Sequence, residues 1–227
     1  MITLAFDTAL GACSVALGDG TTCLAARYEE REAGQAERLI PMMADVLAEA
    51  ALAASAIERI GVTIGPGSFT GTRIGLAAAR AMGVALGIPV IGLTTLDALS
   101  ASAPPEEDVL IAFDARRSQI YVQLFSAEAK DGTRKALSEP VALSVERAAQ
   151  ILPTLTTPRT KNRMALLGSA AEMLAAHWPQ PVTIIPAQYP IAADFLPRIA
   201  RAQVAMQTTS MPRPLYLRSA PEAESAA

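Results

Sequence analysis

The sequence predicts an α/β protein built from two similar lobes, each with the element order βββαβαβα. Each half opens with short segments in which apolar and polar residues alternate, as in antiparallel strands. Each half continues with apolar residues at helical spacing, interrupted by further strand-like runs. The halves also match each other in sequence, which predicts an internal duplication. With 51% hydrophobic and 18% charged residues among 227, the chain has the composition of a folded globular protein.

The first lobe is expected at residues 1–103. Three antiparallel strands are predicted at 2–6, 13–17 and 21–28, separated by short turns. A helix beginning near Gln35 places Leu39, Met43 and Val46 on one face. The expected elements that follow are a strand at 60–64, a glycine-rich loop at 65–71, a helix at 70–86, a strand at 89–93 and a helix at 95–101.

A linker rich in proline and acidic residues is expected at 104–108, followed by the second lobe at 109–212 and a tail at 213–227. A shift of 107 positions places Ala5, Phe6 and Asp7 on Ala112, Phe113 and Asp114. The predicted strands lie at 109–113, 120–125, 134–143, 165–168 and 182–185, and the predicted helices at 144–152, 169–177 and 191–206. The matching aspartates end the first strand of each half.

Two ribonuclease-H-like lobes in this order are the layout of the actin, sugar kinase and Hsp70 ATPase (ASKHA) superfamily, in which hairpin turns offer backbone amides to phosphate. The corresponding residues here are Asp7, Thr8, Gly65, Gly67, Ser68 and Asp114. Ala9 stands where those ATPases have a glycine two residues after the aspartate, so we interpret this set as a relic of a phosphate site. The alternative interpretation is that Asp7 and Asp114 only cap turns.

The residue counts exclude several kinds of site. One histidine, His177, and two cysteines cannot form a zinc site of the usual kind, and no serine, histidine and aspartate arrangement is evident. We therefore expect no catalytic residue, no metal site and no cofactor held by this chain alone. The formal charge of −3 argues against unaided binding of RNA. No secretion signal or membrane span is visible, so a cytoplasmic location without membrane contact is expected.

Six short motifs resemble those of one family. They are AFDTA at residues 5–9, CSVA at 13–16, GPGSFTGTRIG at 65–75, GLTTL at 92–96, FDAR at 113–116 and PLYLR at 214–218. Together they closely resemble the TsaB (YeaZ) family, and the resemblance covers essentially the whole chain.

That resemblance implies a non-catalytic subunit in the synthesis of N6-threonylcarbamoyladenosine at position 37 of tRNA. It implies a heterodimer with the transferase TsaD, support from the ATPase TsaE, a homodimer when TsaD is absent, and contact with tRNA only through the complex. ATP, magnesium and a TsaD-bound metal would belong to that complex. TsaD holds its metal through a His-x-x-x-His pair on a helix, and the helix beginning at Gln35 in this chain has no histidine.

The helix at 70–86 is the expected docking surface for TsaD or for a second copy. Its small residues recur every fourth position and would let another helix approach closely. The expected interface consists of Gly71, Gly75, Ala79, Met82 and Gly83, together with Leu39, Met43 and Val46. The alternative is that this ridge packs inside its own lobe.

Three other functions remain open from the residues alone. A small-molecule kinase would use Asp7 or Asp114 to handle a magnesium-bound phosphate. A peptidase and a pure interaction module are the others. Turnover of ATP by the pure chain would favour the kinase.

Overall fold

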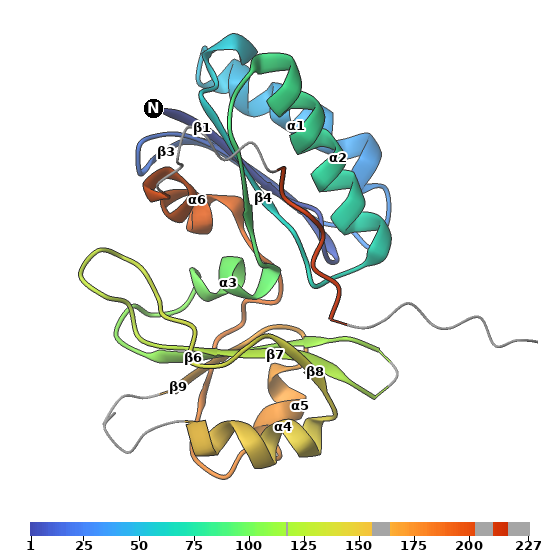
Figure 1. Cartoon of the computed structure of the whole chain (residues 1–227), viewed down its shortest axis with the longest axis vertical. Coiled ribbons are helices and arrows are strands. Elements are labelled where there is room, and N and C mark those ends of the chain that lie inside the picture. Colours follow the sequence, from blue (N-terminus) through green and yellow to red (C-terminus); the bar gives the residue numbers. More distant parts are fainter. Residues whose placement is uncertain (117, 156–163, 203–210, 218–227) are drawn as a thin grey trace, which may run out of the picture.

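The computed structural model describes residues 1–116, 118–155, 164–202 and 211–217. These residues form two lobes, each built on a five-stranded sheet, with one lobe above the other in Figure 1. The predicted element order βββαβαβα is confirmed in both halves. In the described part of the chain, no helix has the length and apolar character needed to span a bilayer.

The first sheet has the strand order β3-β2-β1-β4-β5. Its strands are β1 (Ile2–Asp7), β2 (Ala12–Asp19), β3 (Thr22–Glu30), β4 (Arg59–Thr63) and β5 (Val90–Leu93). The central strand β1 pairs antiparallel with β2 and parallel with β4. The carboxyl ends of β1, β4 and β5 therefore meet at one edge of the sheet, where the glycine-rich loop follows β4.

The second sheet repeats this arrangement with the order β10-β9-β6-β7-β8. Its strands are β6 (Asp108–Asp114), β7 (Ile120–Phe125), β8 (Val141–Leu143), β9 (Met164–Leu167) and β10 (Thr183–Ile184). The predicted third strand at 134–143 is shorter than expected, since only its end forms β8 and an isolated bridge joins Phe125 to Ala136.

Helices cover both faces of each sheet (Figure 1). The first half contains α1 (Gln35–Glu49), α2 (Phe69–Leu86) and α3 (Thr95–Ser100), and the second contains α4 (Val145–Ile151), α5 (Ala171–Ala175) and α6 (Ala192–Arg201). Short 3-10 turns lie at η1 (Ala54–Ala56) and η2 (Leu152–Leu155). The predicted helix at 191–206 ends at Arg201 in the structure, and residues 203–206 lie outside the described part.

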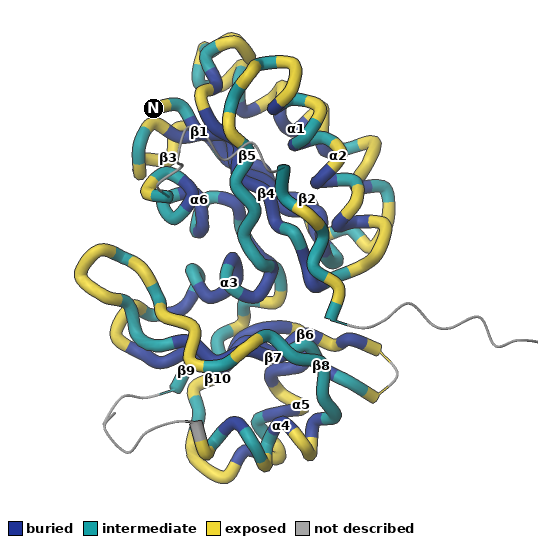
Figure 2. The backbone as a smooth tube through the Cα atoms, viewed as in Figure 1, coloured by how far each residue is buried: buried dark blue, intermediate teal, exposed yellow. Residues whose placement is uncertain are grey.

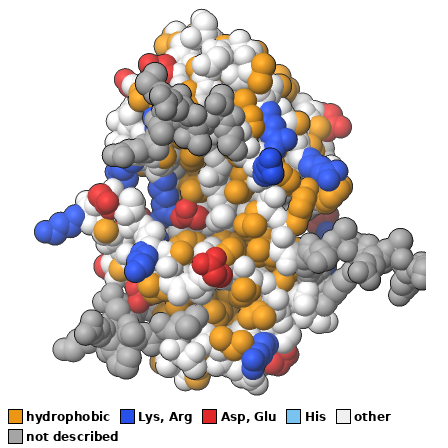
Figure 3. Space-filling model, viewed as in Figure 1, with side chains coloured by type: hydrophobic (Ala, Val, Ile, Leu, Met, Phe, Trp, Pro, Cys, Tyr) orange, Lys and Arg blue, Asp and Glu red, His pale blue; other side chains and the backbone are white. Residues whose placement is uncertain are grey.

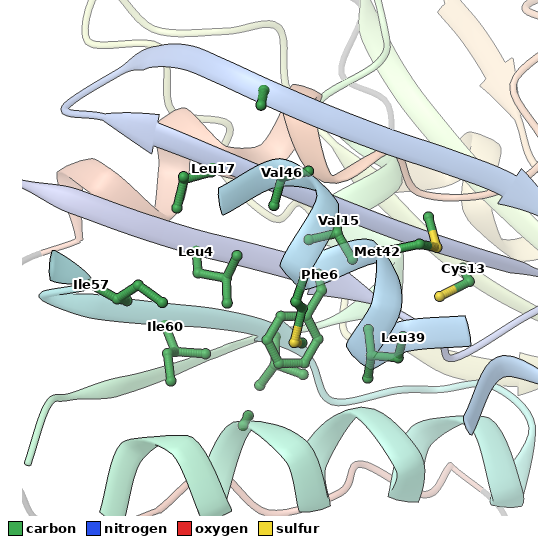
Figure 4. Close-up of a cluster of buried hydrophobic side chains, with 14 of the residues drawn as sticks. Leu4, Phe6, Cys13, Val15, Leu17, Leu39, Met42, Val46, Ile57 and Ile60 are labelled. Carbon is green, nitrogen blue, oxygen red and sulfur yellow. The ribbon is translucent and has the colours of Figure 1, made fainter. Parts of the chain in front are cut away.

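Successive side chains of β1 point to opposite faces of the sheet, so the first lobe has two cores. Leu4 and Phe6 point to the face covered by α1 and α2, where they meet Leu39, Met42 and Val46 (Figure 4). Ala5 points to the opposite face, which α6 covers. The small side chain of Ala5 allows α6 to lie close to the sheet.

The last helix of each half covers the sheet of the other half. Helix α6, from the sequence range assigned to the second lobe, packs on β1 and β2, whereas α3 packs on β6. The boundary at 104–108 thus divides the sequence, but the two halves are interleaved in space. Arg198 of α6 donates hydrogen bonds to the backbone and side chain of Asp97 in α3 and to Ser100 Oγ, which connects the two crossing helices.

A buried arginine attaches α6 to the first sheet. Arg59 of β4 is 7% exposed, and its Nη1 donates to the carbonyl oxygens of Ile199, Ala200 and Ala202 at 2.7, 2.8 and 3.1 Å. These carbonyls lie at the end of the helix, where Ile199 O also accepts a hydrogen bond from Ala202 N of the C-cap at 3.2 Å. The guanidinium therefore both caps α6 and fixes its position on the sheet.

Replacing this arginine should loosen α6. We expect Arg59→Met to lower the free energy of unfolding by about 3 kcal/mol, because three charge-assisted bonds are lost and the carbonyl oxygens of Ala200 and Ala202 lose their guanidinium partner. Urea unfolding followed by circular dichroism measures the change. Arg147→Met, on the exposed surface of α4, is the matched control and should change stability by less than about 0.5 kcal/mol. Equal stabilities for both variants would contradict the capping role.

Candidate functional site

The glycine-rich loop joins β4 to α2 at the carboxyl edge of the first sheet. Ser68 is the N-cap of α2, and its Oγ accepts a hydrogen bond from Gly71 N at 2.9 Å. Ser68 N donates to Ala9 O in the turn between β1 and β2 at 2.7 Å. Two of the amides that a phosphate would need at this helix start are therefore bonded to the chain itself.

The glycines of the loop permit this close contact. A Cβ atom on Gly67 would lie 2.3 Å from Ala9 O, and one on Gly71 would lie 2.1 Å from Thr8 O. Thr8 Oγ1 also donates to Gly71 O at 2.8 Å. The glycines thus serve backbone-to-backbone packing, and the hairpin turn occupies the corner in front of the helix.

Asp7 ends β1 beneath this contact and is fully buried. Its Oδ1 accepts hydrogen bonds from Thr63 Oγ1 at 2.5 Å and from Ala9 N at 3.2 Å, and its Oδ2 has no partner among the described residues. Burial removes water from the carboxylate and raises the pKa of Asp7 from 3.8 to about 6. This carboxylate is buried from solvent, and the neighbouring amides already bond to the chain. The site therefore lacks the accessible groups that a magnesium-bound phosphate needs.

Asp114 occupies the equivalent position in the second lobe but is exposed. Its Oδ1 accepts from Arg116 N at 2.7 Å, the same two-residue turn contact that Asp7 makes with Ala9. Both aspartates therefore cap turns. The structure brings Asp7, Thr8, Gly65, Gly67 and Ser68 together, while Asp114 lies on the other sheet. In the described ranges no three His, Cys, Asp or Glu side chains are grouped as metal ligands.

The expected docking ridge on α2 faces its own sheet, which corrects that prediction. Gly71, Gly75, Ala79 and Gly83 are buried, and Cβ atoms on Gly75 and Gly83 would lie 2.8 Å from Thr8 Oγ1 and 2.4 Å from Val90 Cγ2. Met82 is only partly buried. Leu39, Met43 and Val46 of α1 are also buried in the same core, and Figure 4 shows Leu39 and Val46 there. Small residues were needed here because α2 lies directly on the strands.

The opposite faces of α1 and α2 are exposed (Figure 2). The exposed face of α2 is mainly apolar, whereas that of α1 combines apolar residues with Glu37, Asp45 and Glu49. On α2 they present Ala77, Ala81, Val84 and Ala85, with Val84 73% exposed. On α1, Ile40 is 56% exposed. The sequence contained the signal for this surface, because α2 is apolar all round apart from Arg73 and Arg80, but it did not show which face the sheet covers.

A C-terminal segment, residues 211–217, lies along α2 and was not assigned a role from the sequence. Leu215 N donates to Ile64 O at 2.7 Å, and Arg80 Nε donates to Pro212 O at 3.1 Å. Beside this segment is a cavity of about 130 Å³. Its lining residues are Pro66, Gly67, Phe69, Tyr121, Leu215, Tyr216 and Leu217.

The fold and the closed loop define a two-lobed protein of the actin-like (ASKHA) class whose phosphate corner is filled by its own backbone. A family model described as TsaD: tRNA N6-adenosine threonylcarbamoyltransferase matches residues 29–215. The chain belongs to the TsaD family that this model describes and, within it, to the TsaB (YeaZ) family.

Three relatives illustrate this membership. The tRNA threonylcarbamoyladenosine biosynthesis protein TsaB of Escherichia coli K12 is 38% identical over 122 residues, which are 52% of this chain and 52% of that protein. A Pseudomonas aeruginosa protein with similarity to peptidase YEAZ superposes with a TM-score of 0.79 at 29% identity, covering 96% of this chain and 99% of the other. YeaZ from the same organism has a TM-score of 0.74 at 30% identity, covering 88% and 90%. The chain aligns with about half the length of the curated relatives it matches.

The buried ridge can be tested with a bulky side chain. Gly75→Leu should lower the free energy of unfolding by about 3 kcal/mol or more, because the added atoms meet Thr8 and Val62. Ala77→Leu, two positions away on the exposed face, is the control and should melt within a few degrees of wild type. Thermal melts followed by circular dichroism decide between the faces. If Ala77→Leu were the more damaging change, the orientation of α2 would be wrong.

Asp7 should lower the free energy of unfolding as pH rises, because its pKa is raised in the folded protein. Because the folded state holds the proton more tightly than the unfolded state, this group's contribution is most favourable below about pH 4 and declines by about 3 kcal/mol as pH rises to about 6. Asp7→Asn removes that decline. Unfolding free energies at a series of pH values should show the variant gaining about 3 kcal/mol on wild type between about pH 4 and pH 7. A difference that stays constant with pH would rule out a raised pKa at Asp7.

Proposed function

We propose that this chain is a non-catalytic subunit in the synthesis of N6-threonylcarbamoyladenosine in tRNA, where it binds the transferase TsaD and acts together with the ATPase TsaE. The family match over residues 29–215 carries this proposal. The identity to bacterial proteins named for threonylcarbamoyladenosine biosynthesis supports it. In the proposed complex, ATP, magnesium and the metal site belong to the partner proteins.

The closed loop supports a non-catalytic role. A kinase needs open amides and an accessible carboxylate for magnesium-bound phosphate, whereas Ser68 N is bonded to Ala9 O and Asp7 is sealed in the core. A peptidase needs an activated nucleophile or a metal. The sole histidine, His177, is exposed beyond α5, and its Nδ1 lies 3.1 Å from Met173 O at a helix end.

The exposed faces of α1 and α2 are the proposed docking surface for TsaD, and for a second copy of this chain when TsaD is absent. The docking surface thus lies on the two helices predicted from the sequence, but on the faces that point away from the sheet. Ile40, Ala77, Ala81 and Val84 form an apolar surface without a covering element among the described residues. Small residues on α2 would let a partner helix approach its backbone closely.

A charge placed on this surface should separate binding from folding. We expect Val84→Glu to melt like wild type, to lose TsaD in co-purification by at least about tenfold, and to be mainly monomeric alone, because a buried unpaired carboxylate opposes association. Met173→Glu, at a 50% exposed position on α5, is the matched control and should bind normally. Normal TsaD binding by a folded Val84→Glu variant would refute this docking surface.

Cellular tRNA provides the test of the function itself. Cells lacking the chain should lose N6-threonylcarbamoyladenosine from total tRNA, as measured by mass spectrometry of nucleosides, and wild type or Met173→Glu should restore it. The Val84→Glu variant should restore little of it. Unchanged modification in cells lacking the chain would refute the function.

A further inference from the structure

Two exposed aromatic rings stand together where α2 begins. The rings of Phe69 and Tyr216 are stacked, with centroids 5.8 Å apart and an angle of 26° between their planes. Phe69 is 58% exposed and Tyr216 is 45% exposed. Because the rings are in contact, they form a continuous exposed aromatic surface rather than two isolated side chains. These two come from segments far apart in sequence, so the fold itself brings them together.

An arginine fixes the pair in place. The guanidinium of Arg73 lies 3.5 Å from the centroid of the Phe69 ring, and its Nε donates to Tyr216 Oη at 3.1 Å. Leu215, next to Tyr216, is bonded through its backbone to Ile64. The rings are therefore held in position before any ligand arrives, which reduces the entropy lost on binding.

Arginines without an ion-pair partner in the described part of the chain lie on the same two segments as the rings. In the described ranges, Arg73, Arg80 and Arg213 form no ion pair, whereas Arg27, Arg31, Arg38, Arg134 and Arg198 each have a carboxylate partner. Arg80 contacts the backbone of Pro212, the neighbour of the exposed Arg213. Figure 3 shows Lys and Arg side chains beside hydrophobic ones over α2 and the C-terminal segment. A local positive field thus lies on a chain of net charge −3.

We propose that Phe69, Arg73, Arg80, Arg213 and Tyr216, the aromatic–arginine patch, bind single-stranded RNA. A base stacks on the exposed rings, and phosphates lie against the guanidinium groups. The adjacent cavity, with Tyr121 and Leu215 in its wall, gives room for the edge of a displaced base. The proposal rests on the proposed function in tRNA modification, to which it adds a direct contact between this chain and the RNA.

The number of charges sets the strength of this contact. A few arginines on an acidic chain give weak binding at physiological salt, so the patch supplements the RNA contacts of a partner. The affinity for RNA is therefore measured by fluorescence anisotropy with the full chain at about 50 mM salt, where phosphate contacts are stronger. The probe is a labelled single-stranded RNA of about ten nucleotides, and its duplex form serves as the probe without accessible bases.

We expect Tyr216→Ala to weaken binding of the single strand at least fivefold, and Arg213→Ala to reduce the slope of log affinity against log salt by about 0.7. Tyr28→Ala on β3 and Arg147→Ala on α4 are the matched controls, and both should bind like wild type. The single strand should bind more tightly than the duplex. All variants should melt like wild type, since both test positions are exposed.

Three results would contradict the proposal that this patch binds RNA. They are no binding of the single strand by wild type, equal affinity for wild type and Tyr216→Ala, or equal loss in the controls. Loss of TsaD binding by the Tyr216→Ala variant with unchanged RNA affinity would make the patch a protein surface instead. These readouts do not depend on cellular tRNA modification, so failure of the patch is distinguishable from failure of the proposed function.

Discussion

The contact between the β1–β2 turn and the start of α2 determines much of the first lobe. Thr8 and Ala9 approach Gly67 and Gly71 so closely that a single methyl group on either glycine would collide with a carbonyl oxygen. This contact places the small-residue edge of α2 on the sheet and turns its other side outward. It also takes up amides at the helix start, which leaves the corner without the open geometry of a phosphate site. The same contact therefore uses amides at the start of α2 and leaves the other face of α2 exposed.

Two arginines of low exposure bind the helices where the two halves cross. Arg59 caps α6 on the first sheet, and Arg198 connects α6 to Asp97 on α3. Desolvation raises the pKa of Asp97 above its ordinary value even though the Arg198 guanidinium opposes that shift. Buried charges that are paired in this way specify position more than they add stability. They hold two sheets, each covered by a helix of the other half, in one arrangement.

The C-terminal segment, residues 211–217, packs beside the closed loop of the first lobe. It pairs with Ile64 just after β4 and brings Tyr216 to Phe69, so the surface beside the closed loop contains residues from the first half and from the C-terminal segment. That surface and the exposed faces of α1 and α2 are adjacent, because Phe69 begins α2. The aromatic–arginine patch and the exposed face of α2 are therefore neighbouring surfaces of one lobe.

The sequence by itself determined the element order, because strand alternation, helical spacing and glycine turns are local signals that the structure follows closely, as at β7 and α2. It also determined that too few histidines and cysteines are present for a zinc site. Only the tertiary structure decided which face of α2 is covered, since a helix that is apolar on every side apart from Arg73 and Arg80 has only a weak periodic signal to orient it. Tertiary packing likewise decided that Asp7 is sealed while Asp114 is exposed, although both end equivalent strands. Burial and the meeting of Phe69 with Tyr216 depend on contacts between residues distant in the chain, which no local pattern encodes.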